Sequence, residues 1–166
     1  MSVNTIEPVE IDVPSTRVVR VDLGSASEPE AIRDAMMEGF GRIAVYAASH
    51  GLELTGPPRS VYTAYGPDET RFTLAFPVAA DTPDPGPVGG VSIGELSGGA
   101  MLRFAHTGPY DQLMSAYGRI TEWMIANGHM KSEADWSDHT PMWEEYVNDP
   151  DSTPPEELLT YIYVPA

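Results

Sequence analysis

Two adjacent glutamates between aromatic residues are the side chains in this sequence best suited to chemistry. Glu144 and Glu145 stand in the run Trp143-Glu-Glu-Tyr146, which we predict to be part of a β-strand. Because side chains on a strand alternate between its two faces, Glu144 shares one face with Tyr146, and Glu145 shares the other with Trp143. Either face therefore presents a carboxylate beside an aromatic ring.

A carboxylate in a crevice of the protein is a candidate partner for a cation. Burying an ion costs roughly several kcal/mol, so a buried glutamate either takes up a proton or pairs with a positive charge. An aromatic cation would supply the charge and stack on the neighbouring rings. A second interpretation stays open, in which both acids are solvated on an edge strand.

Further aromatic residues could form the walls of such a site, since tyrosine and tryptophan combine a large apolar face with a polar group. Single aromatic residues in strands more often serve ordinary sheet packing. The segment from His106 to Tyr110 is a predicted strand-to-helix turn, whose backbone amides could meet a ligand. The candidates at strand or helix-start positions are Tyr62, Tyr65, His106, Tyr110, Trp143, Tyr146, Tyr161 and Tyr163.

Several other chemistries lack the residues they need. The chain has no cysteine, which excludes disulfides, thiolate metal sites and cysteine nucleophiles. Its four histidines are scattered, so we expect no metal site. The sequence contains no phosphate-binding loop, dinucleotide fingerprint or Gly-x-Ser-x-Gly motif, and we expect no cofactor.

The chain is strongly acidic, with a formal net charge of −16 from 9 basic and 25 acidic residues. Because such a surface repels phosphate backbones, we expect no direct binding of nucleic acid. The acidity favours cationic ligands or basic partners, although solubility alone would also explain it. The sequence has no long apolar run and no leader peptide, so we expect no membrane span and a cytoplasmic protein.

The two halves of the chain resemble each other. Pro58 and Pro141 are 83 residues apart, and so are Pro67 and Pro150 (141 − 58 = 83; 150 − 67 = 83). Each half also ends in an alternating apolar run. Two copies of a small unit usually meet across a pseudo-twofold axis, and the crevice between them is a natural place for a ligand.

Each unit is predicted to contain a strand or hairpin, then a helix, then two strands joined by short turns. Short connections and one helix per unit favour an α+β fold with an antiparallel sheet, with the helices on one face and a ligand groove between the units. We expect a single domain over residues 1–166, in which a Pro- and Gly-rich linker (79–90) joins unit one (9–78) to unit two (91–165).

Local signals give finer predictions. The run Ser27-Glu28-Pro29-Glu30 matches a helix start with Ser27 as the N-cap. Residues 91–96 and 100–106 flank Ser97-Gly98-Gly99, which predicts that they pair as a hairpin. Residues 130–140 are predicted to be a polar loop.

A series of motifs in the second half carries a resemblance to a known family. They are His106-Thr-Gly-Pro-Tyr110, Glu122-Trp123, Asn127-Gly128, Trp143-Glu-Glu-Tyr-Val-Asn-Asp-Pro150, Pro154-Pro-Glu-Glu157 and Thr160-Tyr-Ile-Tyr-Val-Pro165. In this order they resemble the GyrI-like (gyrase-inhibitor-like, AraC-type effector-binding) small-molecule-binding domains. These are the effector-binding modules of several multidrug-responsive bacterial regulators. The resemblance covers about the whole chain, although the first half contributes mainly through the repeat.

The resemblance has implications for the fold and the site. It implies two tandem strand-helix-strand-strand units about a pseudo-twofold axis, with a groove that holds amphipathic, often cationic, aromatic compounds. It also implies that Glu144 is the acid that faces the ligand, with Tyr146 on the same wall, and that Glu145 is more solvated at the outer surface. The chain has neither the length nor the charge for a separate DNA-binding module, so we expect a stand-alone domain.

Three functions are open at this point. The first, which we favour, is binding of an amphipathic, aromatic and cationic molecule, with Trp143 as the fluorescent reporter. The second is hydrolysis, because some stand-alone members of the family open cyclopropane-bearing DNA-alkylating natural products; Glu144 and Tyr146 would then be the catalytic residues. The third is an acidic protein that binds a basic partner such as a topoisomerase. The sequence leaves open whether there is a protein partner and whether the chain is a monomer or a homodimer.

Overall fold

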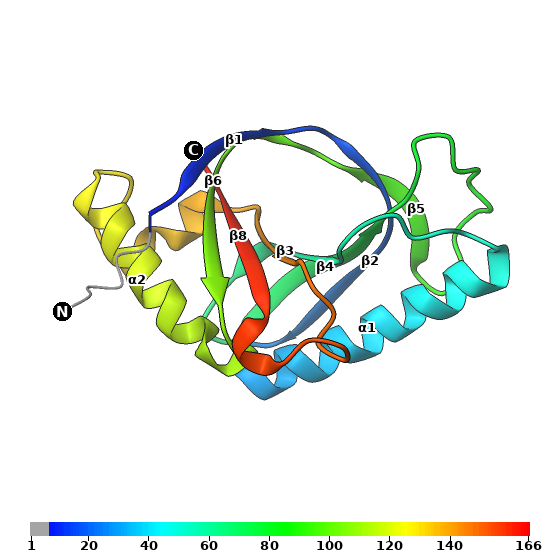
Figure 1. The fold of residues 1–166 in the computed structure, drawn as a ribbon, viewed down its shortest axis with the longest axis horizontal. Coiled ribbons are helices and arrows are strands. Elements are labelled where there is room, and N and C mark those ends of the chain that lie inside the picture. The colour runs from blue at the N-terminus through cyan, green and yellow to red at the C-terminus, as the bar shows by residue number, and fades with distance from the viewer. Residues whose placement is uncertain (1–6) are drawn as a thin grey trace.

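The computed structural model of the protein describes residues 7–166 (Figure 1). Two α-helices and three short 3-10 helices accompany eight strands in this part of the chain. In chain order the elements are β1 (Val9–Val13), β2 (Thr16–Ala26), α1 (Pro29–His50), β3 (Arg59–Tyr65), β4 (Glu69–Pro77), β5 (Val91–Leu96), β6 (Gly99–Thr107), η1 (Tyr110–Gln112), α2 (Leu113–Ala126), η2 (Glu133–His139), β7 (Met142–Tyr146), η3 (Pro155–Glu157) and β8 (Leu159–Pro165).

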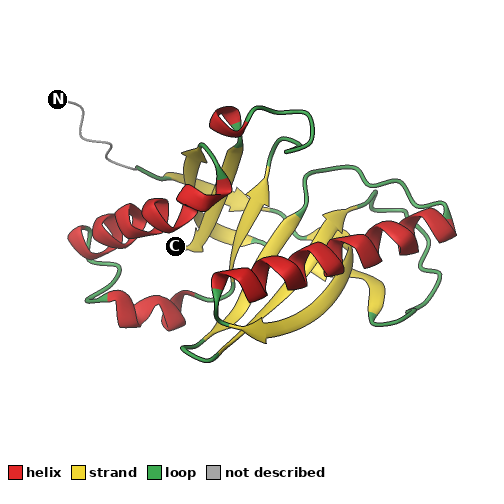
Figure 2. Cartoon of the chain, turned by 90° about the horizontal axis from the view of Figure 1, so that it is seen from below, coloured by secondary structure: helices red, strands yellow, loops and turns green. Residues whose placement is uncertain are grey.

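Both α-helices cover the same face of one antiparallel sheet (Figure 2). The buried side of α1 includes Ile43 and packs on β2, β4 and β5. The buried side of α2 includes Ile120 and Met124, and it packs mainly on β6 and β8. Helical spacing of apolar residues produces both contacts. The predicted α+β class with an antiparallel sheet is confirmed. No helix in the described part of the chain combines the length and apolarity needed to cross a membrane.

The strand order is symmetric between the two halves of the chain. It reads β1-β6-β8-β7-β3-β4-β2-β5 and stays the same when β1–β4 are exchanged with β5–β8. The strand pairs β2/β6 and β3/β7 begin at Thr16/Gly99 and Arg59/Met142, 83 residues apart in both cases (99 − 16 = 83; 142 − 59 = 83). A repeated unit would give this pattern, and the internal duplication itself stays a prediction.

The predicted hairpin between residues 91–96 and 100–106 is wrong. Strand β5 pairs with β2 at one end of the strand order, while β6 pairs with β1 and β8 and is next to the other end. By the same pattern, β1 belongs to the first half of the chain but pairs only with β6 of the second half. The turn signal was correct locally, but it could not indicate that the chain crosses to the other end of the sheet.

Two local predictions also need correction. Helix α1 has Glu28 rather than Ser27 as its N-cap, and the Ser27 hydroxyl instead donates to the Gly66 carbonyl oxygen at 2.5 Å. This bond ties the start of α1 to the β3–β4 turn. The loop predicted for residues 130–140 contains the 3-10 helix η2, which begins with a capping box formed by Ser132 and Asp135.

The face of the sheet opposite the helices is concave and also forms a core. Figure 1 shows the sheet curled, with the β1–β2 and β5–β6 connections arching over this side. All eight strands contribute to its cluster of side chains: Ile11, Val13, Val18, Val61, Ala75, Leu96, Met101, Trp143, Tyr161 and Tyr163.

The two arching connections touch at Gly98, which gives a test of the fold. A Cβ atom at Gly98 would lie 1.8 Å from the backbone oxygen of Val13. Because backbone cannot move aside cheaply, Gly98→Ala should lower the free energy of unfolding by about 3 kcal/mol, as in overpacked cores. The matched control is Gly118→Ala on α2, where a Cβ meets nothing within 4 Å; it should stabilise by about 0.5–1 kcal/mol. Denaturant unfolding of both variants would measure this, and equal effects would contradict the close approach.

Candidate functional site

Glu144 lies near the middle of the helix-covered face of the sheet, where the two halves of the chain meet. It stands on β7, directly opposite Ser60 on the neighbouring strand β3. These two strands occupy the centre of the strand order. Alternation along β7 turns Glu144 toward the helices, and the residue is only 5% exposed. The structure thus places a carboxyl group in the interior between α1 and α2.

Two tyrosines hold the carboxyl group of Glu144. The hydroxyl of Tyr117, on α2, donates to Oε2 at 2.5 Å, and the hydroxyl of Tyr146 donates to Oε1 at 2.7 Å. Within residues 7–166 the three ion pairs are Arg20–Asp22, Arg59–Glu145 and Arg71–Glu69. Glu144 belongs to none of them, so its polar partners are neutral hydroxyl groups.

Burial shifts the ionisation of this group and its neighbours. It raises the pKa of Glu144, although the hydrogen bonds from Tyr117 and Tyr146 act in the opposite direction. Burial also raises the pKa of Tyr117 and Tyr146 well above the usual range, and the charge of Glu144 adds to this effect. The tyrosines therefore stay neutral donors, while Glu144 either holds a proton or requires a positive charge nearby.

Aromatic rings from both halves surround the carboxyl group. Tyr146 packs edge-on against Tyr110 and Phe40, with ring centroids 5.6 Å and 6.5 Å apart. Tyr117 packs edge-on against Trp136 of η2 at 6.0 Å. Tyr62 on β3 packs against the cores beneath both helices, and its pKa is raised by burial and by the charge of Glu144. These rings form an aromatic enclosure around one acid.

The structure brings together four of the predicted site residues: Glu144, Tyr146, Tyr62 and Tyr110. His106 on β6 lies on the same face of the sheet but farther from Glu144. Strand β8 separates β6 from β7, and its Thr160 lies between His106 and Tyr146. His106 is buried, with Nε2 at 3.3 Å from the Pro109 carbonyl oxygen. Tyr65 is 59% exposed at the end of β3. These two residues lie at the margin of the site or outside it.

Trp143 lies on the concave face, on the other side of the sheet from Glu144. It stacks on Tyr163 with ring centroids 5.1 Å apart, and the Arg59 guanidinium lies 5.7 Å from its ring. Grouping Trp143 with Glu144 in one site therefore does not fit the geometry. We assign the role of fluorescent reporter to Trp136 instead, because Trp136 contacts Tyr117.

Glu145 also departs from the prediction. It is more exposed than Glu144, as expected, but it does not lie at an outer surface. Its side chain is 13% exposed and pairs with Arg59 at 3.4 Å. The prediction assumed a sheet with one solvated face, whereas the curled sheet encloses a second core on that side.

Residues that the sequence reasoning left out complete the site: Tyr117, Ser60, Met36 and Trp136. Tyr117 lies on α2, within the apolar stripe that faces the sheet. A tyrosine in a buried helical stripe usually needs a polar partner for its hydroxyl group, and this signal could have linked Tyr117 to Glu144. Ser60 carries no comparable signal, because its place opposite Glu144 depends on pairing between distant strands.

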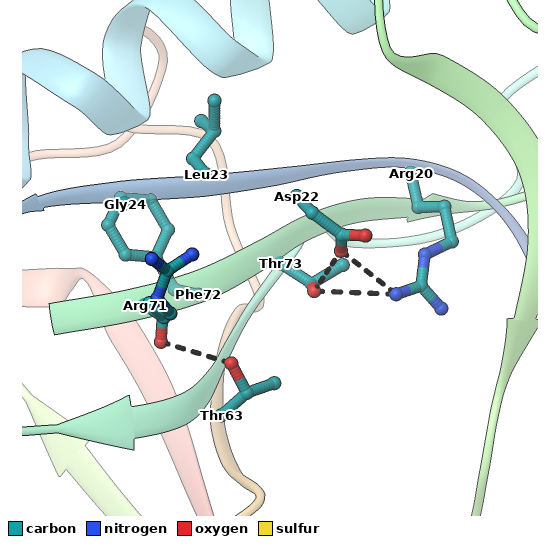
Figure 3. A pocket seen from close by; sticks show the side chains of 8 residues that line it. All are labelled: Arg20, Asp22, Leu23, Gly24, Thr63, Arg71, Phe72 and Thr73. Carbon is teal, nitrogen blue, oxygen red and sulfur yellow. Dashed lines mark hydrogen bonds and ion pairs between the residues drawn. The ribbon is translucent and has the colours of Figure 1, made fainter.

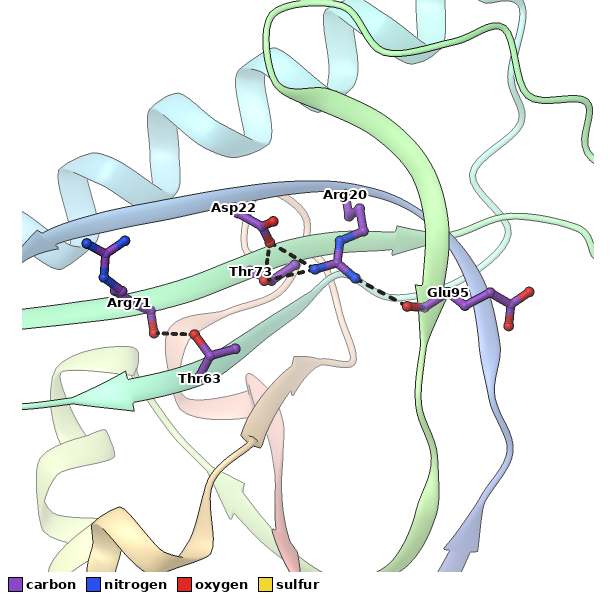
Figure 4. Close-up of polar contacts among 6 residues, drawn as sticks. All are labelled: Arg20, Asp22, Thr63, Arg71, Thr73 and Glu95. Atoms are coloured by element: carbon purple, nitrogen blue, oxygen red, sulfur yellow. Dashed lines mark hydrogen bonds and ion pairs between the residues drawn. The ribbon is translucent and has the colours of Figure 1, made fainter.

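Two depressions of the surface lie away from Glu144. The first, of about 360 Å³, opens on the concave side and is lined by polar groups of Arg20, Asp22, Thr63, Arg71 and Thr73 (Figure 3). In it, Arg20 donates to Asp22 at 2.9 Å and to the Glu95 carbonyl oxygen at 3.2 Å (Figure 4). The second, of about 300 Å³, is lined by residues 128–131, Asp135, Asp138 and His139. Neither of these two depressions includes Glu144 in its lining.

The described residues contain no group of three or more His, Asp or Glu side chains arranged to hold a metal ion. The chemistry available at Glu144 is that of a carboxyl group, hydroxyl groups and aromatic rings. This set suits recognition of a cation or proton transfer by the carboxyl group.

Solved structures with the same fold include proteins of several kinds. The C-terminal domain of EcmrR superposes with a TM-score of 0.75 at 17% identity, covering 96% of both chains. A hydrolase from Listeria innocua gives 0.60 at 14% identity, covering 96% of this chain and 91% of the other. SAV2435 bound to tetraphenylphosphonium gives 0.58 at 13% identity, covering 96% and 93%. At these identities the likeness shows the fold alone, and no curated protein sequence matches the chain.

A family model provides the assignment that these distant structures cannot. The model of the GyrI-like small molecule binding domain matches residues 7–166, nearly the whole chain. The match spans both halves of the sheet and the enclosure around Glu144. The protein therefore belongs to the family of GyrI-like small-molecule-binding domains.

Proposed function

We propose that the protein binds amphipathic aromatic cations, with Glu144 as the charge partner. One observation carries this proposal: a carboxyl group buried among tyrosines, without a basic partner in the described part of the chain. The family assignment shows a small-molecule-binding domain. SAV2435, a protein of the same fold, was solved with the cation tetraphenylphosphonium, which supports a cationic ligand here.

The buried position of Glu144 favours a cationic ligand over a neutral one. Burial disfavours the ionised carboxylate of Glu144. A cation bound beside it would offset this cost, because an opposite charge nearby favours the ionised form. The faces of Tyr62, Tyr110 and Tyr146 would add cation–π attraction, which reaches about 2 kcal/mol for a desolvated cation. A neutral ligand of the same shape would gain only the apolar contact.

The ligand would enter between the two helices. Tyr110, Tyr146 and Phe40 are each partly exposed, so this side of the enclosure borders solvent. Met114 lies one helical turn before Tyr117 and is 74% exposed. Methionine adapts its shape easily, which suits the rim of a site that accepts ligands of varied form.

Two ions of the same shape and opposite charge test the proposal. Tetraphenylphosphonium should bind with roughly micromolar affinity and quench the fluorescence of Trp136, whereas tetraphenylborate should bind at least tenfold more weakly. The titrations belong in 1 M sodium chloride, where the Debye length is about 3 Å and the overall negative charge has little influence. Trp136→Phe should abolish the quenching without abolishing binding measured by calorimetry. Equal affinity for the two ions would show that apolar contact alone drives binding.

A hydrolase is the second candidate, and the ionisation of Glu144 is the observation that favours it. A carboxyl group with a raised pKa, hydrogen-bonded by two tyrosines, is suited to donate a proton to a strained electrophile or to activate water. Its substrates would be cyclopropane-bearing alkylating natural products. Consumption of excess compound would reveal an enzyme, whereas a binder saturates at one equivalent. Binding to a basic protein such as a topoisomerase is a third hypothesis, and strong weakening by salt would characterise it.

A further inference from the structure

We propose that Ser60 and Met36 form a hydroxyl relay with Tyr146, which frees Oε1 of Glu144 for an N–H group of the ligand. The inference deepens the proposed function and rests on it, because it assumes that the cation binds at Glu144. Its consequence concerns ligand class. The site should use the relay for ammonium ions that carry an N–H bond and should not need it for quaternary cations.

The relay is based on a choice open to the Tyr146 hydroxyl group. This group lies 2.7 Å from Oε1 of Glu144 and 3.0 Å from Oγ of Ser60, and both atoms can accept its single proton. The Ser60 hydroxyl lies 3.5 Å from Sδ of Met36. Ser60 is completely buried, so its hydroxyl group must find its hydrogen-bond partners within the protein.

Two arrangements of the same atoms follow. In the first, Ser60 donates to the Tyr146 oxygen and Tyr146 donates to Glu144. In the second, both hydroxyl groups have turned, so that Tyr146 donates to Ser60 and Ser60 donates to the weakly accepting sulfur of Met36. No donor is left without an acceptor in either arrangement. Only the second arrangement releases Oε1 of Glu144.

The other carboxylate oxygen has no such freedom. Oε2 is held by Tyr117 at 2.5 Å, and within the described residues Glu144 is the only hydrogen-bond partner of the Tyr117 hydroxyl group. Releasing Oε2 would leave a buried hydroxyl donor unpaired, which is unfavourable. The two tyrosines therefore have different roles: Tyr117 fixes the carboxylate, and Tyr146 can withdraw from it.

The chemistry of the ligand decides whether turning the Tyr146 hydroxyl away from Oε1 of Glu144 affects affinity. A protonated amine binds best when its N–H points at a carboxylate oxygen, since charge-assisted hydrogen bonds are the strong ones. Its N–H would compete with the Tyr146 hydroxyl for Oε1, and the relay gives that hydroxyl another acceptor. A quaternary cation has no N–H bond and interacts with the carboxylate through charge alone, so the Tyr146 hydrogen bond can stay in place.

The test uses two probes that differ only at nitrogen: 1-naphthylmethylammonium and its N,N,N-trimethyl analogue. Calorimetry with Ser60→Ala should show about tenfold weaker binding of the primary ammonium ion, as expected for one impaired charge-assisted hydrogen bond. The trimethyl probe should lose much less affinity than the primary ammonium ion, because the Tyr146 hydrogen bond to Glu144 can stay in place when it binds, and its binding also shows that the variant is folded. In a Tyr146→Phe background Oε1 is already free, and Ser60→Ala should then change neither affinity.

The possible results distinguish a failure of the relay from a failure of the proposed cation binding. If Ser60→Ala weakens both probes equally, Ser60 only supports the packing, and the relay is wrong. If it weakens neither, Oε1 accepts Tyr146 and the ligand together, and the relay is again wrong. A loss that persists in the Tyr146→Phe background would likewise overturn it. If neither probe binds the wild-type protein, the proposed function fails and the relay fails with it.

Discussion

Replacing Glu144 with glutamine should weaken the binding of tetraphenylphosphonium by at least tenfold. The substitution removes the charge while nearly preserving the volume and one carbonyl acceptor for the tyrosines. Loss of a desolvated charge partner usually costs about 2 kcal/mol or more, which corresponds to a factor of ten to a hundred. Fluorescence titration at Trp136 would measure the effect, and tetraphenylborate should show no comparable loss.

The matched control is the neighbouring acid, Glu145. It has the same charge and lies one residue away, but it pairs with Arg59 on the opposite face of the sheet. Glu145→Gln should therefore leave tetraphenylphosphonium affinity within about a factor of two. If Glu145→Gln abolished binding and Glu144→Gln did not, the ligand site would be on the concave face with Trp143.

The second large effect concerns the dependence of stability on pH. The folded protein raises the pKa of Glu144 above its ordinary value of 4.5. Between 4.5 and the raised value, the folded state therefore holds a proton that the unfolded state has lost, so the free energy of unfolding falls as pH rises. Glu144→Gln removes this loss and should stabilise the protein at neutral pH, by about 1.4 kcal/mol for each unit of pKa shift.

Thermal unfolding from pH 4 to pH 8 would measure this effect. The melting temperatures of wild type and Glu144→Gln should differ by a constant amount below pH 4.5 and diverge above it, by about 2–4 °C per kcal/mol for a chain of this size. Glu145→Gln should instead destabilise at neutral pH, because it leaves Arg59, whose side chain is only 13% exposed, without its carboxylate. A wild type that gains stability over the glutamine variant with rising pH would contradict the raised pKa.

The affinity for the cation should also depend on pH, because protonation of Glu144 competes with binding of the cation. Tetraphenylphosphonium has no titrating group, so any pH dependence of its binding belongs to the protein. Below the raised pKa of Glu144 the cation must displace a proton, and affinity should rise by up to about tenfold per pH unit, then level off above that pKa. In Glu144→Gln the curve should be flat.

Local patterns in the sequence were sufficient to predict the class of the fold, whereas the choice of Glu144 over Glu145 depended on the family resemblance. Short turns and one helix per half indicated an antiparallel α+β sheet, and the structure confirms it. Strand alternation correctly separated Glu144 and Tyr146 from Trp143 and Glu145. These features depend on residues that are close in sequence, so a single sequence contains the information for them.

Features that depend on distant strands could not be predicted in this way. The turn at Gly98 has a hairpin signature, but its flanking strands pair elsewhere because the sheet curls and its ends approach each other. The same curl covers most of the Glu145 side chain, which alternation alone would leave in solvent. Ser60 could not be placed beside Glu144 without the register of β3 on β7. Tyr117 differs from these, because its position in a buried helical stripe carried a signal.

The exchange of first strands between the halves ties them into one cooperative unit. Strand β1 completes the sheet beside β6, and β5 completes it beside β2, so neither half can finish its own hydrogen-bond ladder. A fragment of either half alone would expose an unpaired strand edge, which invites pairing with other chains. Folding must also join residues as far apart as Val9 and Arg103 before the edges close, and such long-range pairing is slow. The central strands β7 and β3, which carry Glu144 and Ser60, lie between these two exchanged edges. The parts of the site contributed by the two halves should therefore form and unfold together.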